Sequence, residues 1–350
     1  MTHVLLLLGC AVVIYVSCEW FVNAVEWLGL RLRVGPLAVG TVLAAIGTAL
    51  PESVVTFVAV VFGRGAASHD IGVGAAMGGP LVLATLAYGV TGTLLLVRRR
   101  DRAKVAAPAG GTGTAPDARG LPGAPEGLGD PARLARDQTW FLYIFVVKVG
   151  LGLVAFAVKP WLGLAFFAAY GVYFWREIRA GGPAAHAPDL APLKLQRRRA
   201  TPATWAVLVQ SLATVAVIFG ASQVFVGQLE AVGPVLGLRA TVTALLLAPV
   251  ATELPEIMNA IIWVRQGKTT LALANISGAM MIQATVPSGL GLLFTPWRFD
   301  AALIAAGLAT MASIGYQLVL LHRNQLTARR LCLAAVPYAA FAATLVVLRP

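Results

Sequence analysis

The chain has 350 residues, of which 58% are hydrophobic and 12% are charged, and its mean hydropathy is +0.79. A soluble domain carries about twice that charged fraction, so the composition excludes an ordinary soluble protein. The formal net charge of +12 needs no nucleic acid to explain it, because most basic residues gather in segments between apolar runs, where they face anionic lipid. We therefore expect membrane lipid as a partner and no nucleic acid.

Ten apolar runs follow one another along the chain, and most reach the roughly 20 residues that a helix needs to cross a bilayer. We predict membrane-spanning helices at 4–30, 35–63, 70–97, 139–158, 160–178, 204–230, 236–264, 269–294, 298–321 and 329–348. The first run is expected to stay in the protein, because no basic signal-peptide segment precedes it. The predicted fold class is an all-α polytopic membrane protein.

One acidic motif occurs twice, in the second and the seventh predicted span. It reads Gly-Thr-Ala-Leu-Pro-Glu up to Glu52 and Ala-Thr-Glu-Leu-Pro-Glu up to Glu256. The same offset aligns Phe21 with Phe225 and other pairs around the motif, so the two halves are an internal repeat. A carboxylate in hydrocarbon costs at least about 2.5–3.5 kcal/mol. Two acids at matched positions therefore indicate a cation site near the middle of the membrane.

The basic residues also predict the orientation. Most of the 27 lysines and arginines lie in alternate connections between the spans, and basic connections stay in the cytoplasm. We expect a multi-pass protein of the cell membrane with both its N-terminus and its C-terminus outside. The first span and its repeat counterpart, the sixth, then run in opposite directions, so the two five-helix halves are inverted, as in many secondary transporters.

Composition divides the chain into six segments. The loop between the third and fourth spans is rich in Gly and Pro and opens with arginines, so we expect it to be solvated and without regular structure. The segments are a first repeat core at 1–97, this loop at 98–138, spans four and five at 139–178, a basic linker at 179–203, a second repeat core at 204–294 and the last two spans at 295–350.

The residues around each motif acid are hydroxyls and amides at helical spacing. Thr48 and Glu52 share one helix face, and Thr252, Glu256 and Asn259 share another. A proline directly precedes each acid and leaves the carbonyl four residues earlier without its helical donor, so we predict a broken helix in both copies. Such clusters of oxygen atoms suit hard cations such as Ca²⁺ or Na⁺.

The paired motifs and the Gly- and Asn-containing sequences that follow them resemble the sodium/calcium exchanger family of the cation:calcium antiporter superfamily. Members of that family have two inverted five-helix repeats, each with a Gly-Thr-Ser-Leu-Pro-Glu-type and then a Gly-Asn…Gly-Ser-Asn-type motif. The resemblance covers both halves, most clearly 17–92 and 221–294. The residues that it implies in the ion pathway are Thr48, Glu52, Thr252, Glu256 and Asn275.

The second motif of each repeat departs from the family pattern. In the first repeat, Ala75 stands where Asn is expected, and Gly79 and Pro80 stand where Ser-Asn is expected. In the second repeat, Ala279 and Met280 replace the corresponding polar pair. Because these ligands are lost, the family's usual ratio of several sodium ions per calcium is not carried over to this chain.

The second repeat also carries an extra acid. Glu253 stands where the family has Ser, and we expect it to line the pathway. Neighbouring carboxylates cannot all stay ionised without cations, since repulsion and desolvation both penalise the charged forms, so protons are expected to compete with the metal ion. Gln283, followed by Val286 and Pro287, is also similar to the proton/calcium branch of the superfamily.

Two further charged groups lie within predicted spans. Glu19, Asn23 and Glu26 form a polar stripe that faces either a cavity or a neighbouring helix. Glu19 is a candidate proton or ion gate, with a structural role as the favoured alternative. Lys148 is expected to extend its ammonium group toward the membrane interface.

The sequence favours a secondary antiporter that exchanges Ca²⁺ or a similar cation for Na⁺ or H⁺ by alternating access. Its partners are the transported cations and membrane lipid, no other cofactor is expected, and the oligomeric state stays open. The chain contains no His-Glu-x-x-His and no Gly-x-Ser-x-Gly motif, so no enzyme is expected. A proton-coupled carrier of another solute, or a non-transporting scaffold or sensor, remains an alternative.

Overall fold

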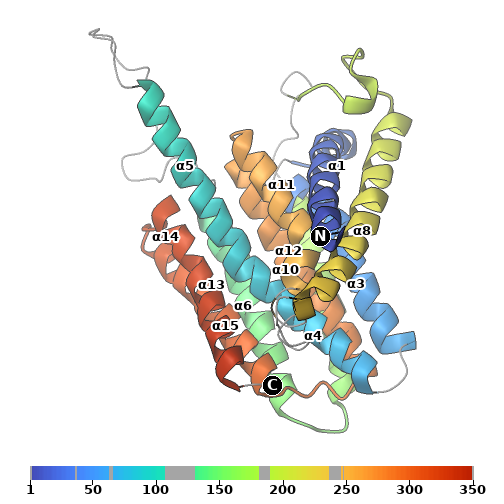
Figure 1. Cartoon of the computed structure of the whole chain (residues 1–350), viewed down its shortest axis with the longest axis vertical. Helices are drawn as coiled ribbons and strands as arrows, with labels where there is room; N and C mark the ends of the chain where they lie inside the picture. The colour runs from blue at the N-terminus through green and yellow to red at the C-terminus, as the bar shows by residue number, and fades with distance from the viewer. Residues whose placement is uncertain are drawn as a thin grey trace.

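The computed structural model describes residues 2–35, 38–62, 66–106, 131–180, 190–235, 246 and 248–348, and these residues fold into a helical bundle (Figure 1). Within them, five helices are each long and apolar enough to cross a membrane: Leu5–Leu32, Gly72–Arg98, Thr204–Phe225, Thr269–Phe294 and Ala301–His322. Helix is present at each of the ten predicted spans, so the all-α prediction is confirmed.

The first half contains spans one to five. Its helices are α1 (Thr2–Leu32), η1 (Val39–Ala44), α3 (Ala45–Phe57), η2 (Val58–Phe62), α4 (Ala66–Val82), η3 (Leu83–Ala87), α5 (Tyr88–Ala106), α6 (Pro131–Leu153), η4 (Lys159–Trp161) and α7 (Leu162–Ala180). The elements η1, η2 and η3 are wider π-helical turns, which are common at functional sites in helices.

The second half contains spans six to ten. Its helices are η6 (Lys194–Gln196), α8 (Thr204–Val235), α10 (Ala248–Thr252), α11 (Leu254–Arg265), α12 (Thr269–Phe294), α13 (Ala301–His322), α14 (Ala328–Cys332), η8 (Leu333–Ala335) and α15 (Val336–Leu348). Most of the first part of span seven, up to residue 247, lies outside the described residues.

The loop predicted at 98–138 is helical at both of its ends, so that prediction was wrong there. Helix α5 continues to Ala106 and α6 begins at Pro131. Arginine and alanine are good helix formers, and proline is favoured at the first position of a helix, which explains both extensions. Residues 107–130 lie outside the described part of the chain.

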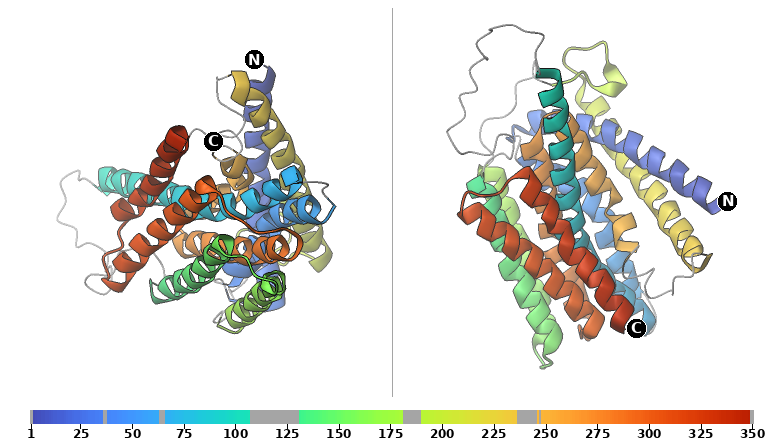
Figure 2. Two further views of the ribbon diagram at one scale, coloured as in Figure 1. Left: turned by 90° about the horizontal axis from the view of Figure 1, so that it is seen from below. Right: turned by 60° about the vertical axis from the view of Figure 1, so that its left-hand side comes forward.

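The bundle is organised around α12. This helix contacts α3, α4, α6, α7 and α11, and it is buried along nearly its whole length. The helix carries no charged side chain and many small and apolar ones, which suits such a position. The predicted repeat partners α1 and α8 pack along each other and form one flank, whereas α13 and α15 lie on the other (Figure 2).

Candidate cation site

The second acidic motif breaks its helix. Helix α10 ends at Thr252 and α11 begins at Leu254, with Glu253 at the junction. Pro255 takes the second position of α11, where its missing N–H removes no helical bond. Glu256 lies in the first turn, where the positive end of the helix dipole stabilises a carboxylate. The break predicted for this copy is confirmed.

The first copy is different. Helix α3 continues through Pro51, and π-helical turns precede and follow it at η1 and η2, so the predicted break in this copy was wrong. A proline removes one backbone bond, but helices in membranes tolerate that loss when neighbouring groups satisfy the freed carbonyl. The side chain of Glu52 lies outside the described part of the chain, so its predicted place at the site stays a prediction.

Glu256 is the central observation. Its side chain is 0% exposed, and neither carboxylate oxygen has a hydrogen-bond partner among the described residues. Thr48, from the other repeat, lies close enough to interact with this carboxyl, although its hydroxyl donates to the Ala44 carbonyl at 3.1 Å. A buried carboxylate without hydrogen bonds is strongly disfavoured. A bound cation relieves that penalty.

Glu253 has a different environment. It is also fully buried, and Gln283 Nε2 donates to both of its oxygens at 2.8 Å. The two side chains fill the space beside Gly79 of α4, where a Cβ atom would come within 2.7 Å of Glu253 Oε1. The glycine that stands where the family has Ser therefore makes room for the extra carboxylate of the other repeat.

The amide groups of α11 and α12 complete the polar region. Asn275 Nδ2 donates to the Glu256 carbonyl at 3.4 Å, and its Oδ1 has no partner among the described residues. Asn259 is fully buried, and both of its amide atoms lack partners in the same part of the chain. Thr252 instead donates to the Pro249 carbonyl of its own helix. The side-chain oxygens of Glu256, Asn259 and Asn275 therefore have no hydrogen-bond partner among the described residues.

Helix crossing places these groups from the two repeats beside one another. Gly278 of α12 lies against the backbone of Thr41 in η1, so closely that a Cβ atom would come within 2.6 Å of the Thr41 Cα. Gly40 lies against Ala274 in the same way. Small residues allow this approach, and it holds Asn275 next to the segment that leads to Thr48.

The donor set consists of carboxylates, amides and hydroxyls. In the described part of the chain no three His, Cys, Asp or Glu side chains come together; the acids described at the site are Glu253 and Glu256. The nearest thiol is Cys18 of α1, whose Sγ lies 3.7 Å from the Pro255 carbonyl. An oxygen-rich set with few carboxylates suits Ca²⁺ or Na⁺ better than a thiophilic metal.

Lys148 contradicts its prediction. The side chain is 0% exposed, and Nζ donates to the Ala76 carbonyl at 2.8 Å and lies 4.7 Å from the centre of the Phe145 ring. The Ala76 carbonyl is the one that Pro80, four residues on, leaves without a helical donor. Lys148 therefore satisfies a proline-freed carbonyl of α4, a role that only the fold could reveal.

The polar stripe of α1 faces neighbouring segments. Glu19 forms an ion pair with Lys194 at 3.0 Å. Asn23 donates to backbone carbonyls of the segment before η6. Glu26 accepts from Trp263 Nε1 at 2.9 Å and pairs with Lys268 at 2.5 Å. These residues hold α1 in place, so the structural reading of Glu19 agrees with its contacts.

Comparison with known proteins defines the family. Residues 2–178 and 206–347 match the family model described as sodium/calcium exchanger protein. The chain belongs to this family. Its members are transporters, so the protein is a multi-pass membrane antiporter of cations and not an enzyme.

Individual relatives agree with this assignment. A protein of Alkalimonas amylolytica with the name "Putative antiporter CaxA" is 26% identical over 322 residues, which cover 91% of this chain and 88% of that one. The solved sodium-calcium exchanger NCX_Mj, soaked with 10 mM Na⁺ and zero Ca²⁺, superposes with a TM-score of 0.71 at 16% identity over 98% of each chain. Soaked with 2.5 mM Na⁺ and 0.1 mM Ca²⁺, it matches over 99% of each chain. The likeness confirms the predicted exchanger fold of two inverted repeats.

Proposed function

We propose that this protein exchanges Ca²⁺ or a similar cation for Na⁺ or H⁺ by alternating access, at a site centred on Glu256. The observation that carries the proposal is the fully buried Glu256 carboxyl, whose two oxygens have no hydrogen-bond partner among the described residues. A carboxylate in that position binds a cation or a proton, because each neutralises its charge.

The proposed ligands come from both repeats. Glu256 and Asn275 supply oxygens that have no hydrogen-bond partner in the described part of the chain, and Thr48 supplies a hydroxyl from the first repeat. Glu253 joins the shell when Gln283 releases its oxygens. The remaining proposed ligands, Thr252 and Glu52, rest on the motif alone.

The ion that is exchanged for Ca²⁺ is proposed from the ligands and the charge of the site. Ala75, Gly79 and Pro80 offer no side-chain oxygen in the first repeat, so the site has fewer ligands for additional sodium ions. Two adjacent buried carboxyls can instead exchange one divalent cation for protons, because a proton neutralises each acid without a coordination shell. We therefore favour H⁺ over Na⁺ as the counter-ion.

We further propose that both termini lie outside the cell membrane. The support is the concentration of arginine and lysine in alternate connections, among them the end of α5 and the segment that contains η6. In this orientation the two repeats face opposite sides of the bilayer, as alternating access by related halves requires.

The test is uptake of calcium-45 and sodium-22 into proteoliposomes with an imposed proton or sodium gradient. The proposal predicts Ca²⁺ uptake driven by a proton gradient, and loss of at least about 90% of that uptake in Glu256→Gln. The matched control is Glu19→Gln, which removes an acid that pairs with Lys194 away from the site and is expected to keep most of the uptake. Unchanged uptake in Glu256→Gln refutes the site, and uptake driven by sodium alone refutes the choice of counter-ion.

A further inference from the structure

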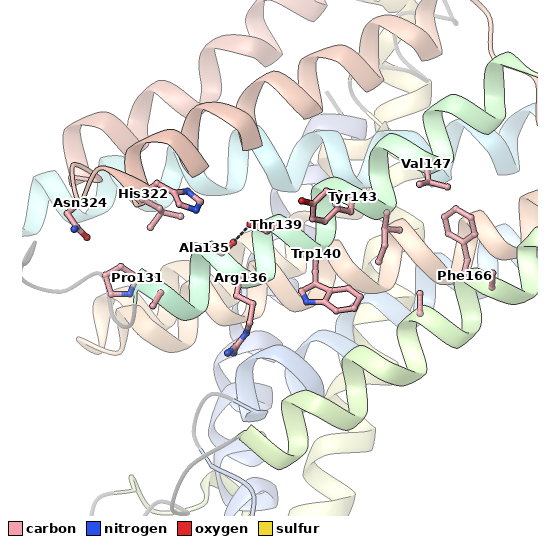
Figure 3. Close-up of a pocket in the computed structure, with 15 residues that line it drawn as sticks. Pro131, Ala135, Arg136, Thr139, Trp140, Tyr143, Val147, Phe166, His322 and Asn324 are labelled. Atoms are coloured by element: carbon pink, nitrogen blue, oxygen red, sulfur yellow. Dashed lines mark hydrogen bonds between the residues drawn. The ribbon is translucent and has the colours of Figure 1, made fainter.

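A groove of about 870 Å³ runs along α6 between α7 and the end of α13 (Figure 3). Its lining changes character along its length. Trp140, Tyr143, Val147 and Phe166 line one part, and Arg136 lies toward the other end, together with the last residues of α13 (Figure 3). The groove is therefore apolar along the bundle and cationic where α6 begins.

A second cavity, of about 430 Å³, adjoins the first and shares Arg136 with it. Its other cationic residues are Arg176 and Arg179 of α7. The guanidinium groups are held by aromatic rings: that of Arg176 lies 5.1 Å from the centre of the Trp140 ring, and that of Arg179 lies 4.1 Å from the Trp175 ring. Stacking restricts these side chains and leaves their N–H groups free to bind an anion.

Two acids nearby, Glu177 and Asp137, offset only part of the positive charge of the arginines around them. Glu177 lines the second cavity but is only 2% exposed, and it pairs with Arg133 and accepts from the Thr41 hydroxyl at 3.0 Å. Asp137, beside Arg136, is 4% exposed. Both carboxyls are buried, whereas Arg136 and the two arginines of α7 are exposed. An approaching ligand therefore meets three positive charges.

We propose that an anionic phospholipid binds here, with its phosphate at Arg136, Arg176 and Arg179 and an acyl chain in the groove along Trp140 and Tyr143. One guanidinium group can donate two parallel N–H···O hydrogen bonds to a phosphate. The arginines lie at the end of the bundle that is predicted to face the cytoplasm, where anionic lipids are concentrated. A soluble anion would leave the apolar groove empty, and a neutral lipid would leave the arginines without a partner.

The bound lipid would link three parts of the bundle. The groove is lined by α6, α7 and the end of α13, and α7 packs directly on the central helix α12. A lipid in this place restrains α6 and α7 relative to α13. The proposal concerns binding alone, so it stands independently of the transport function proposed above.

The experiment is native mass spectrometry of the purified full-length protein, titrated in detergent with phosphatidylglycerol or phosphatidylcholine. One phosphatidylglycerol per chain is expected to be retained more tightly than phosphatidylcholine. Each arginine near a membrane surface contributes about a fivefold change in affinity. Replacing Arg136, Arg176 and Arg179 together with Gln is therefore expected to weaken retention about a hundredfold.

The matched control replaces Arg197, Arg198 and Arg199 with Gln. These residues are exposed, belong to the same predicted side of the membrane and lie outside both cavities, so phosphatidylglycerol retention is expected to stay unchanged. An equal loss in both triple variants means diffuse attraction of anionic lipid and overturns the proposal. Equal retention by the wild type and the groove triple variant overturns it as well.

A second pair of variants tests the apolar part without changing charge. Ala169 lines the groove, and its exposed neighbour Ala168 does not. Ala169→Trp is expected to fill the groove and reduce phosphatidylglycerol retention at least tenfold, whereas Ala168→Trp leaves it unchanged. Full retention by Ala169→Trp, or binding of water-soluble glycerol phosphate as tight as that of the lipid, contradicts the proposal. Wild-type protein that retains no lipid and dimerises through this face also contradicts it.

Discussion

Gly79 of α4 lies so close to Glu253 that a Cβ atom at residue 79 would come within 2.7 Å of Glu253 Oε1. The two residues belong to different repeats, and each departs from the pattern of the family that the sequence resembles. The structure relates the two departures: the residue without a side chain makes room for the larger acid and for Gln283, which binds it.

This relationship predicts the effect of restoring the family residue. Gly79→Ser is expected to lower the free energy of unfolding by about 1–3 kcal/mol, because its side chain overlaps the Glu253–Gln283 pair. The double variant Gly79→Ser with Glu253→Ser is expected to recover most of that loss, since the smaller serine leaves space. Denaturation of the purified variants in detergent measures both values. Gly74→Ser is the control, because among the described residues no group beyond the local helix lies within 4 Å of its added Cβ atom.

The contact between Lys148 and Ala76 predicts a coupling with Pro80. Lys148→Met leaves the Ala76 carbonyl buried without a donor, which costs about 1–3 kcal/mol. Pro80→Ala restores a backbone N–H that can donate to that carbonyl. In a Pro80→Ala protein, Lys148→Met is therefore expected to lower the free energy of unfolding by less than it does in the wild type.

A double-mutant cycle measured by denaturation gives the coupling, expected at about 0.5–3 kcal/mol. The control cycle combines Lys148→Met with Pro287→Ala in α12, whose proline frees a different carbonyl, and additive effects are expected there. Additive effects for Pro80 as well would show that Lys148 does not serve the freed carbonyl.

The two bonds from Gln283 to Glu253 predict the cost of removing that amide. Gln283→Met takes away the donor of both carboxylate oxygens and is expected to lower the free energy of unfolding by about 1–3 kcal/mol or more, because the acid stays buried. Gln138→Met removes the amide donor of the buried Gln317 Oε1 and is expected to cost less, at the lower end of about 1–3 kcal/mol, because that acceptor is uncharged. A larger loss for Gln138→Met than for Gln283→Met would contradict this ranking.

The sequence predicted the helical fold and the repeat well, because both depend on features that repeat along the chain: long apolar runs and an acidic motif that recurs. It also predicted the break before Glu256, since Pro255 stands directly before it. The same local rule failed at Pro51, where the helix continues. The position of a proline predicts which backbone hydrogen bond is lost, but whether the helix ends there depends on tertiary packing.

Contacts between segments far apart in the chain could not be predicted from the sequence. Lys148 is read from sequence alone as an interfacial lysine, because nothing near it in the chain reveals that Ala76 lies beside it. The sequence likewise does not reveal that Gln283 binds Glu253 across 30 residues. In both cases the partner is set by helix packing around α12.

The central claim is that the Glu256 carboxyl, which has no hydrogen-bond partner among the described residues, binds the transported cation. A direct measurement is the change in unfolding temperature of the purified protein when Ca²⁺ is added. Saturating cation at about 100 times its dissociation constant stabilises the folded state by about 2.7 kcal/mol, so the wild type is expected to unfold at a higher temperature with Ca²⁺ than without it. Glu256→Gln is expected to fold at least as stably without cation and to show no rise with Ca²⁺. An equal rise in Glu256→Gln and the wild type would contradict the account.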